Sequence, residues 1–158
     1  METSSPPWTT PGPPIRMADR GLLLDTHVWL WVVEGQEGEL SASCIDAIEV
    51  HRASGAAQVS AVSVREVALL VARGRLHLSM PPDLWTRRAL GPVGLRSLAL
   101  DVESAGVSAG LPGSFPRDPA DQMLVASAIV HGLTLVTRDS AVLAYGRAGH
   151  VAVLDAGA

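Results

Sequence analysis

The sequence contains no lysine, and all 12 of its basic residues are arginine. This absence excludes mechanisms that depend on a catalytic lysine, such as a P-loop lysine or a Schiff base. The chain holds a single cysteine, Cys44. One cysteine forms neither an intramolecular disulfide nor a cysteine-based zinc motif. We therefore expect Cys44 to be a small core residue of a helix.

Excess charge and long apolar runs are also missing. The net charge is −4 and the isoelectric point is about 5.7, which argues against a general polyanion-binding protein with a basic stripe. Arginine still suits bidentate contact with phosphate at a local site. No apolar run approaches the roughly 20 residues of a membrane span, and the N-terminus lacks the apolar centre of a signal peptide. We expect a cytoplasmic protein with no membrane segment.

The first 16 residues combine prolines with small polar residues. This composition predicts a disordered tail over residues 1–16, and the remaining residues 17–158 have the length of one domain. Met17 lies just before the first predicted strand and is a candidate translation start. The alternative for the tail is a docking segment around Trp8.

Short apolar segments alternate with helical patterns from residue 21 onward, and hydrophobic residues make up 47% of the chain. The alternation predicts an α/β domain, with a central parallel sheet of four to five strands and helices on both faces. The expected strands are residues 21–25, 58–62, 95–100, 133–137 and 151–154. The expected helices are residues 26–33, 41–52, 63–73, 81–90, 101–109, 119–131 and 140–145.

Four acidic residues stand near the carboxyl ends of predicted strands. Asp25 ends the first strand, and Glu66 lies one turn into the helix after the second. Asp121 lies in the first turn of the helix 119–131, and Asp139 follows the fourth strand by two residues. If the strands are parallel, these residues meet at one end of the sheet, where open α/β folds place their chemistry.

Crowded carboxylates repel one another, and the repulsion raises the pKa of at least one of them. A divalent cation removes this cost, and Mg²⁺ prefers oxygen ligands while keeping several waters. The acids therefore predict a metal site at which activated water attacks a phosphodiester. Structural alternatives remain: Ser63 and Glu66 have the form of a capping box, Asp118 and Asp121 suit a helix start, and Asp139 suits a cap.

Four segments carry a resemblance to a known nuclease family. They are LLLDTHVWLW (22–31), VSAVSVRE (59–66), RDPADQMLVA (117–126) and LVTRD (135–139). In this order and at these spacings they resemble the PIN-domain nucleases, and most closely the VapC-like toxins of bacterial toxin–antitoxin pairs. The resemblance covers about residues 21–155, which is nearly the whole predicted domain.

The resemblance implies a single PIN-like domain that hydrolyses RNA endonucleolytically with Mg²⁺ or Mn²⁺. It also implies a homodimer and a cognate antitoxin, a peptide of which lies across the active-site groove. The implied metal-binding and catalytic residues are Asp25, Glu66, Asp121 and Asp139. The implied auxiliary residues are Thr26 and Thr137, which support the site, and Asp118, which is either an auxiliary acid or only a cap.

Several further polar residues lie close to these motifs. Arg65, Arg117 and Arg138 each neighbour a proposed acid and are candidates for binding substrate phosphate; the alternative is that they pair with acids or point to solvent. His27 is either a catalytic base or a packed residue. Gln122 departs from the family, which commonly has arginine there, and the proline-rich tail is a second departure.

Three other enzyme classes are each excluded by a residue or motif that the sequence lacks. A haloacid-dehalogenase-type phosphatase needs an acid where His27 stands, a response-regulator receiver needs a lysine, and a Rossmann dehydrogenase needs a Gly-x-Gly-x-x-Gly after the first strand. Two alternatives stay open. One is a PIN-fold nuclease of RNA processing outside a toxin pair, and the other is a non-catalytic interaction module.

Overall fold

The computed structural model describes residues 20–158, so the predicted tail of residues 1–16 lies outside the described residues. Its centre is a five-stranded sheet in the order β3-β2-β1-β4-β5, with every neighbouring pair parallel. The strands are β1 (Leu22–Leu24), β2 (Ala57–Ser60), β3 (Arg96–Leu98), β4 (Thr134–Thr137) and β5 (Val153–Asp155). The predicted parallel α/β fold is confirmed.

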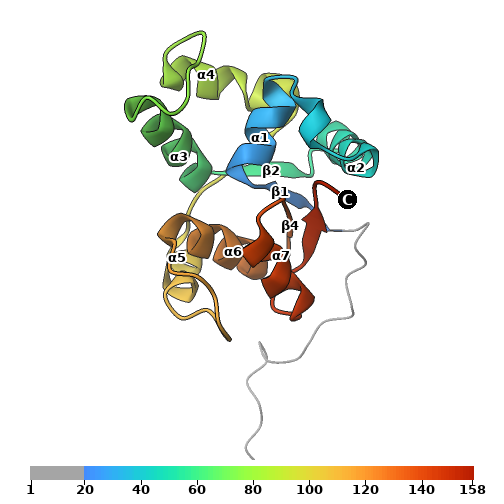
Figure 1. Cartoon of the computed structure of the whole chain (residues 1–158), viewed down its shortest axis with the longest axis vertical. Coiled ribbons are helices and arrows are strands. Elements are labelled where there is room, and N and C mark those ends of the chain that lie inside the picture. Colours follow the sequence, from blue (N-terminus) through green and yellow to red (C-terminus); the bar gives the residue numbers. More distant parts are fainter. Residues whose placement is uncertain (1–19) are drawn as a thin grey trace, which may run out of the picture.

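Helices cover both faces of this sheet. Figure 1 shows α1 and α2 on one side of the strands, and α6 and α7 on the other. The α-helices are α1 (Thr26–Val33), α2 (Ala42–Ala53), α3 (Ala61–Ala72), α4 (Pro82–Arg88), α5 (Val102–Ser108), α6 (Pro119–His131) and α7 (Ser140–Arg147). Two short 3-10 helices are η3 (Glu37–Glu39) and η4 (Gly91–Val93). Within residues 20–158, none of the helices has the length and apolar character to cross a membrane.

The central strand β1 is buried on both faces. Leu22 and Leu24 belong to the core beneath α1 and α2, whereas Leu23 belongs to the core beneath α6 and α7. Successive side chains of a strand point to opposite faces, and a strand covered on both faces is apolar throughout. This is why three leucines in a row form a strand here.

Tryptophans hold α1 and α4 together. Trp29 is fully buried, its ring lies 4.8 Å from that of Trp85, and its indole N–H donates to the Ala89 carbonyl at 2.8 Å. The indole nitrogen of Trp85 donates to Glu34 at 2.6 Å. Buried indole rings therefore gain apolar contact without leaving their N–H groups unpaired.

The strand order places a topological switch point beside β1. The chain proceeds from β1 to β2 and β3 on one side, and it fills the other side with β4 and β5. The Asp25 N–H donates to the Val136 carbonyl at 3.0 Å, which extends the pairing of β1 and β4 past the end of β1. Ligands of open α/β sheets bind in the crevice at such a point, and Asp25 stands at it.

The junction of β2 and α3 differs from the sequence prediction. We expected a strand to residue 62 and a helix from Ser63, but β2 ends at Ser60 and its hydroxyl caps α3 by accepting from the Val62 N–H at 3.1 Å. Ser63 lies inside the helix, fully buried, with the Thr26 hydroxyl 2.9 Å away. The capping box of Ser63 and Glu66 is therefore wrong, because Ser60 fills the capping position.

Candidate active site

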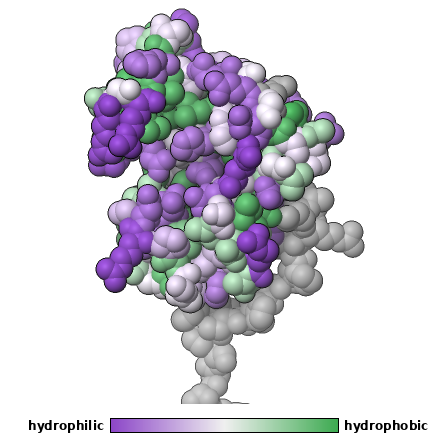
Figure 2. All heavy atoms as spheres, in the orientation of Figure 1, coloured by the Kyte–Doolittle hydropathy of each residue, from purple (hydrophilic) through white to green (hydrophobic). Residues whose placement is uncertain are grey.

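A pocket of about 730 Å³ opens at the carboxyl edge of the sheet. Its walls come from α1, α3, the start of α6 and the segment after β4. Figure 2 shows the surface hollowed between the two halves of the molecule, with hydrophilic residues around the hollow. The carboxylates that line the pocket are Asp25, Glu66, Asp118, Asp121 and Asp139. All the predicted acids are thus brought to one pocket.

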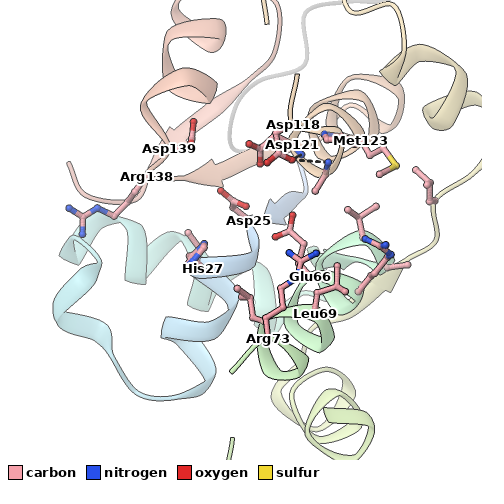
Figure 3. Close-up of a pocket in the computed structure, with 18 of the residues that line it drawn as sticks. Asp25, His27, Glu66, Leu69, Arg73, Asp118, Asp121, Met123, Arg138 and Asp139 are labelled. Atoms are coloured by element: carbon pink, nitrogen blue, oxygen red, sulfur yellow. Dashed lines mark hydrogen bonds between the residues drawn. The ribbon is translucent and has the colours of Figure 1, made fainter. Parts of the chain in front are cut away.

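These carboxylates do not all point the same way. Figure 3 shows Asp25, Glu66, Asp118 and Asp121 turned toward a common space, whereas Asp139 lies to one side and points away from it. Asp25 follows β1, Glu66 comes from α3, and Asp121 comes from the first turn of α6. Residues far apart in the sequence therefore meet because the carboxyl ends of parallel strands share one edge.

Both oxygens of the Asp25 carboxylate accept hydrogen bonds. Oδ1 accepts from the Thr26 N–H at 2.7 Å, as the N-cap of α1, and Oδ2 accepts from the Thr137 hydroxyl at 2.7 Å. Thr137 is fully buried, so the donor cannot turn to water. The carboxylate is held in a single orientation with its remaining lone pairs available.

Thr26 connects α1 to α3 at the pocket. Its buried hydroxyl donates a hydrogen bond to Ser63 Oγ at 2.9 Å. Burial raises the pKa of Glu66; the nearby Thr26 hydroxyl opposes this rise, and the charges of Asp25 and Asp118 add to it. Burial and the neighbouring acids therefore disfavour the charged form of Glu66.

Asp121 has the most perturbed carboxyl of the pocket. Burial, together with the negative charges of Asp118, Asp25, Asp139 and Glu66, raises its pKa to about 7. Removal from water disfavours the charged form of a carboxyl, and nearby carboxylates disfavour it further. The raised pKa expected for at least one of these acids is thus found at Asp121, with burial as the main cause and crowding as the second.

Asp118 and Asp139 have structural roles as well. Asp118 accepts two backbone N–H groups from the first turn of α6, and Asp139 accepts two from α7, at 2.9 to 3.2 Å. In each case the hydrogen bonds reach only Oδ1. The predicted capping alternative is thus correct for both, although both side chains also line the pocket.

The donor chemistry of the pocket suits a hard divalent cation. Within the described part of the chain, no three His, Cys, Asp or Glu side chains are arranged to hold one ion directly. Mg²⁺ does not require such a cage, because proteins commonly bind it through one or two carboxylates while it keeps several waters. Asp25, Glu66 and Asp121 offer these oxygens, and a cation would offset the repulsion that raises the pKa of Asp121.

The three predicted phosphate-binding arginines take different places. Arg65 and Arg138 line the pocket, whereas Arg117 is exposed and does not line it. The Arg138 guanidinium forms an ion pair with Glu39 at 2.8 Å and lies 5.8 Å from the ring centroid of Trp31. Figure 3 shows it directed away from the carboxylates. Arg138 therefore ties the segment after β4 to η3 and α1.

A family model of the PIN domain matches residues 22–148. The chain belongs to the PIN-domain family. It is 39% identical over 119 residues to Ribonuclease VapC22 of Mycobacterium tuberculosis, a match covering 75% of this chain and 86% of that protein. The resemblance inferred from the four motifs is confirmed.

Solved structures with a similar fold include a toxin–antitoxin complex from Klebsiella pneumoniae. DNA-bound VapBC from Salmonella typhimurium matches with a TM-score of 0.60 at 18% identity, covering 86% of this chain and 98% of that chain. FitAcB from Neisseria gonorrhoeae matches with a TM-score of 0.57 at 23% identity, covering 85% of this chain and 96% of that chain. At these identities the likeness establishes a shared fold.

Two positions of this PIN domain have environments that the sequence left open. Gln122, where the family commonly has arginine, donates its side-chain N–H to the Pro116 carbonyl at 3.2 Å and supports the loop before α6. His27 lines the pocket while exposed, with its ring 6.0 Å from that of Trp31. Gln122 therefore braces a loop, whereas His27 faces the acids.

Sequence reasoning missed one charged residue of the PIN-domain pocket. Arg73, at the C-terminal end of α3, lines it together with Arg65, Leu69 and Leu70. The signal was present, because positions four apart on a helix share a face and residues 65, 69 and 73 have that spacing. It was not used because Arg73 lies outside the acid-bearing motifs.

Proposed function

We propose that this chain is a divalent-metal-dependent endoribonuclease, a toxin of the VapC type that hydrolyses phosphodiester bonds of RNA. The observation that carries the proposal is the joint placement of Asp25, Glu66 and Asp121, from three separate elements, in one pocket. The similarity to a relative named a ribonuclease supports the choice of RNA.

Asp25, Glu66 and Asp121 are the residues that would hold Mg²⁺ or Mn²⁺. The ion, when bound, supplies an activated water and neutralises negative charge on the phosphate. Thr137 keeps the Asp25 carboxylate in one orientation, and Thr26 joins the start of α1 to Ser63 of α3, the helix that carries Glu66. Asp139 and Asp118 hold the first turns of their helices and add negative charge beside the pocket.

The partners follow from the same comparison. The structures with a similar fold include a toxin–antitoxin complex from Klebsiella pneumoniae and VapBC complexes, which supports an antitoxin that binds this chain and covers the pocket. We also propose a homodimer and a cytoplasmic location, where the RNA substrate is found. An RNA-processing nuclease outside a toxin pair would carry the same site without such an antitoxin.

Cleavage of RNA by the purified chain, free of antitoxin, tests the activity. Labelled RNA is incubated with Mg²⁺ or Mn²⁺ and, separately, with EDTA. We expect fragments only with metal, and a rate about 100-fold lower for Asp25→Asn and Asp121→Asn, because losing even a partner that orients a metal ligand typically costs about 10- to 100-fold. Asp46→Asn, an exposed acid of α2 outside the pocket, is the matched control.

Two results would contradict the proposal. Cleavage at the full rate by a folded Asp25→Asn chain would remove the proposed site. Neither cleavage nor binding of Mn²⁺ by the folded wild-type chain would favour a non-catalytic interaction module. Circular dichroism and thermal unfolding of each variant establish that the chain is folded.

A further inference from the structure

We propose that Arg73 binds a phosphate of the RNA strand next to the phosphate that is cleaved. The inference rests on the proposed ribonuclease activity and extends the site along α3. It assigns to a residue outside the acid motifs the task of holding the flanking strand.

The pocket continues along α3 beyond the carboxylates. Glu66, Leu69, Leu70 and Arg73 all line it, and Figure 3 shows Glu66, Leu69 and Arg73 following one another along the helix. A helix rises about 1.5 Å per residue, so Arg73 lies roughly 10 Å along the axis from Glu66. Seven residues are about two helical turns, so Arg73 stands two turns beyond Glu66 on the same face of α3.

The order of chemical groups along this wall matches a nucleic-acid strand. Glu66 belongs to the acidic end, where a cation would receive one phosphate. Leu69 and Leu70 are half-buried apolar residues in the middle, and Arg73 is a cation at the far end. A strand repeats the same order, with an anionic phosphate, a nucleoside with apolar faces, and the next phosphate.

Arg73 is free to bind a ligand, whereas Arg138, at the opposite rim of the pocket, is not. Arg138 is already paired with Glu39 and stacked on Trp31. Within residues 20–158, the exposed Arg73 side chain makes no ion pair or side-chain hydrogen bond, and the same holds for Arg65. A guanidinium facing a pocket without a partner is well suited to bidentate contact with phosphate.

Arg73 stands at the C-terminal end of α3, where a cation also has a purely structural role. A cation near a helix C-terminus interacts favourably with the helix dipole, and this alone would explain an arginine there. That role predicts a change in stability but no change in RNA binding. Measuring RNA binding therefore separates the two roles.

The experiment measures RNA binding as salt is varied. Asp25→Asn chains, which do not cut the probe, are titrated into a fluorescein-labelled single-stranded RNA of mixed sequence at constant Mg²⁺. Each phosphate contact contributes about 0.7 to the slope of log K against log salt for single strands. We expect Arg73→Gln to lower this slope by about 0.7 and to weaken binding at low salt.

Arg75→Gln is the matched control, because Arg75 is exposed, lies two residues away and does not line the pocket. Its slope should equal that of the parent chain. Equal slopes for the parent and Arg73→Gln would overturn the proposal, and so would equal losses in Arg73→Gln and Arg75→Gln. If Arg73→Gln weakens the binding of a poly-glutamate peptide but not of RNA, the wall formed by α3 binds an acidic protein partner instead.

The RNA cleavage assay tests the proposed ribonuclease activity independently of the Arg73 contact. If the wild-type chain cleaves RNA with metal but the slope is unchanged by Arg73→Gln, the contact is wrong and the nuclease stands. If the chain cleaves no RNA but the slope falls only in Arg73→Gln, the contact stands and the nuclease proposal fails.

Discussion

The Thr137 hydroxyl donates a hydrogen bond to Asp25 Oδ2 at 2.7 Å across 112 residues of sequence. The same hydroxyl accepts from the Asp139 N–H at 3.0 Å. A threonine hydroxyl has one donor and two acceptor positions, and here both kinds are used. One buried oxygen thus joins the end of β1 to the segment after β4 and sets the position of two acids.

Replacing Thr137 by valine should reduce both activity and stability. The substitution keeps the shape but removes the donor to Asp25 and leaves the Asp139 N–H without its partner. An unpaired buried polar group costs about 1–3 kcal/mol, so we expect a loss of that order in the free energy of unfolding, measured with urea. Thr137→Ser keeps the hydroxyl and should retain most RNA cleavage. Equal cleavage by both variants would show that the hydroxyl does not position Asp25.

The raised pKa of Asp121 predicts how the stability of the metal-free chain depends on pH. The folded chain holds the Asp121 proton up to about pH 7, whereas the unfolded chain releases it near 3.8. Proton binding therefore stabilises the folded chain at low pH, and this contribution is lost as the pH rises from about 4 to about 7. Glu66, whose pKa is raised as well, acts in the same direction.

Asp121→Asn should remove the Asp121 contribution, because an amide does not ionise. In EDTA, we expect this variant to unfold at a higher temperature than the wild-type chain at about pH 8, and the difference should shrink toward about pH 4. Asp46→Asn serves as the control and should show no such trend. A difference that is constant with pH would mean that Asp121 does not carry the shifted proton.

Two substitutions of Asp139 separate its charge from its capping role. Asparagine caps a helix about as well as aspartate, whereas alanine does not. Asp139→Ala should lower the free energy of unfolding by about 1 kcal/mol relative to Asp139→Asn. If the charge of Asp139 contributes to the site, Asp139→Asn should lower RNA cleavage, though less than Asp25→Asn does. Unchanged cleavage in Asp139→Asn would leave Asp139 with the cap alone.

Gly146 marks a close approach of α7 to β5. A Cβ at this position would lie 2.3 Å from Cγ2 of Val153, and a β-branched side chain has little freedom to turn away. Gly146→Ala should therefore destabilise the fold by about 1–3 kcal/mol, although alanine is the better helix former. In a Val153→Ala background the same change should cost far less. An equal cost in both backgrounds, measured by urea unfolding, would place the clash elsewhere.

Much of the fold followed from local patterns. The apolar run of β1, the caps Asp118 and Asp139, and Gly132 at the end of α6 all act within a few residues, so their signals are readable in the sequence. Boundaries were less secure where two residues compete for one role. Ser60 and Ser63 both suit a helix start; in the structure Ser60 is the cap, whereas Ser63 accepts from Thr26, which lies far away in the sequence.

The site divides along the same line. The positions of the acids just after the strands are readable in the sequence. Because the strands are parallel, their carboxyl ends lie at one edge of the sheet, and the acids meet there. Only the tertiary structure decided which side chains are engaged: Arg138 is paired with Glu39, Arg117 lies outside the pocket, and Arg73 lines it. The physical reason is that caps and burial patterns are local, whereas ion pairs and pocket walls depend on contacts between segments far apart in the chain.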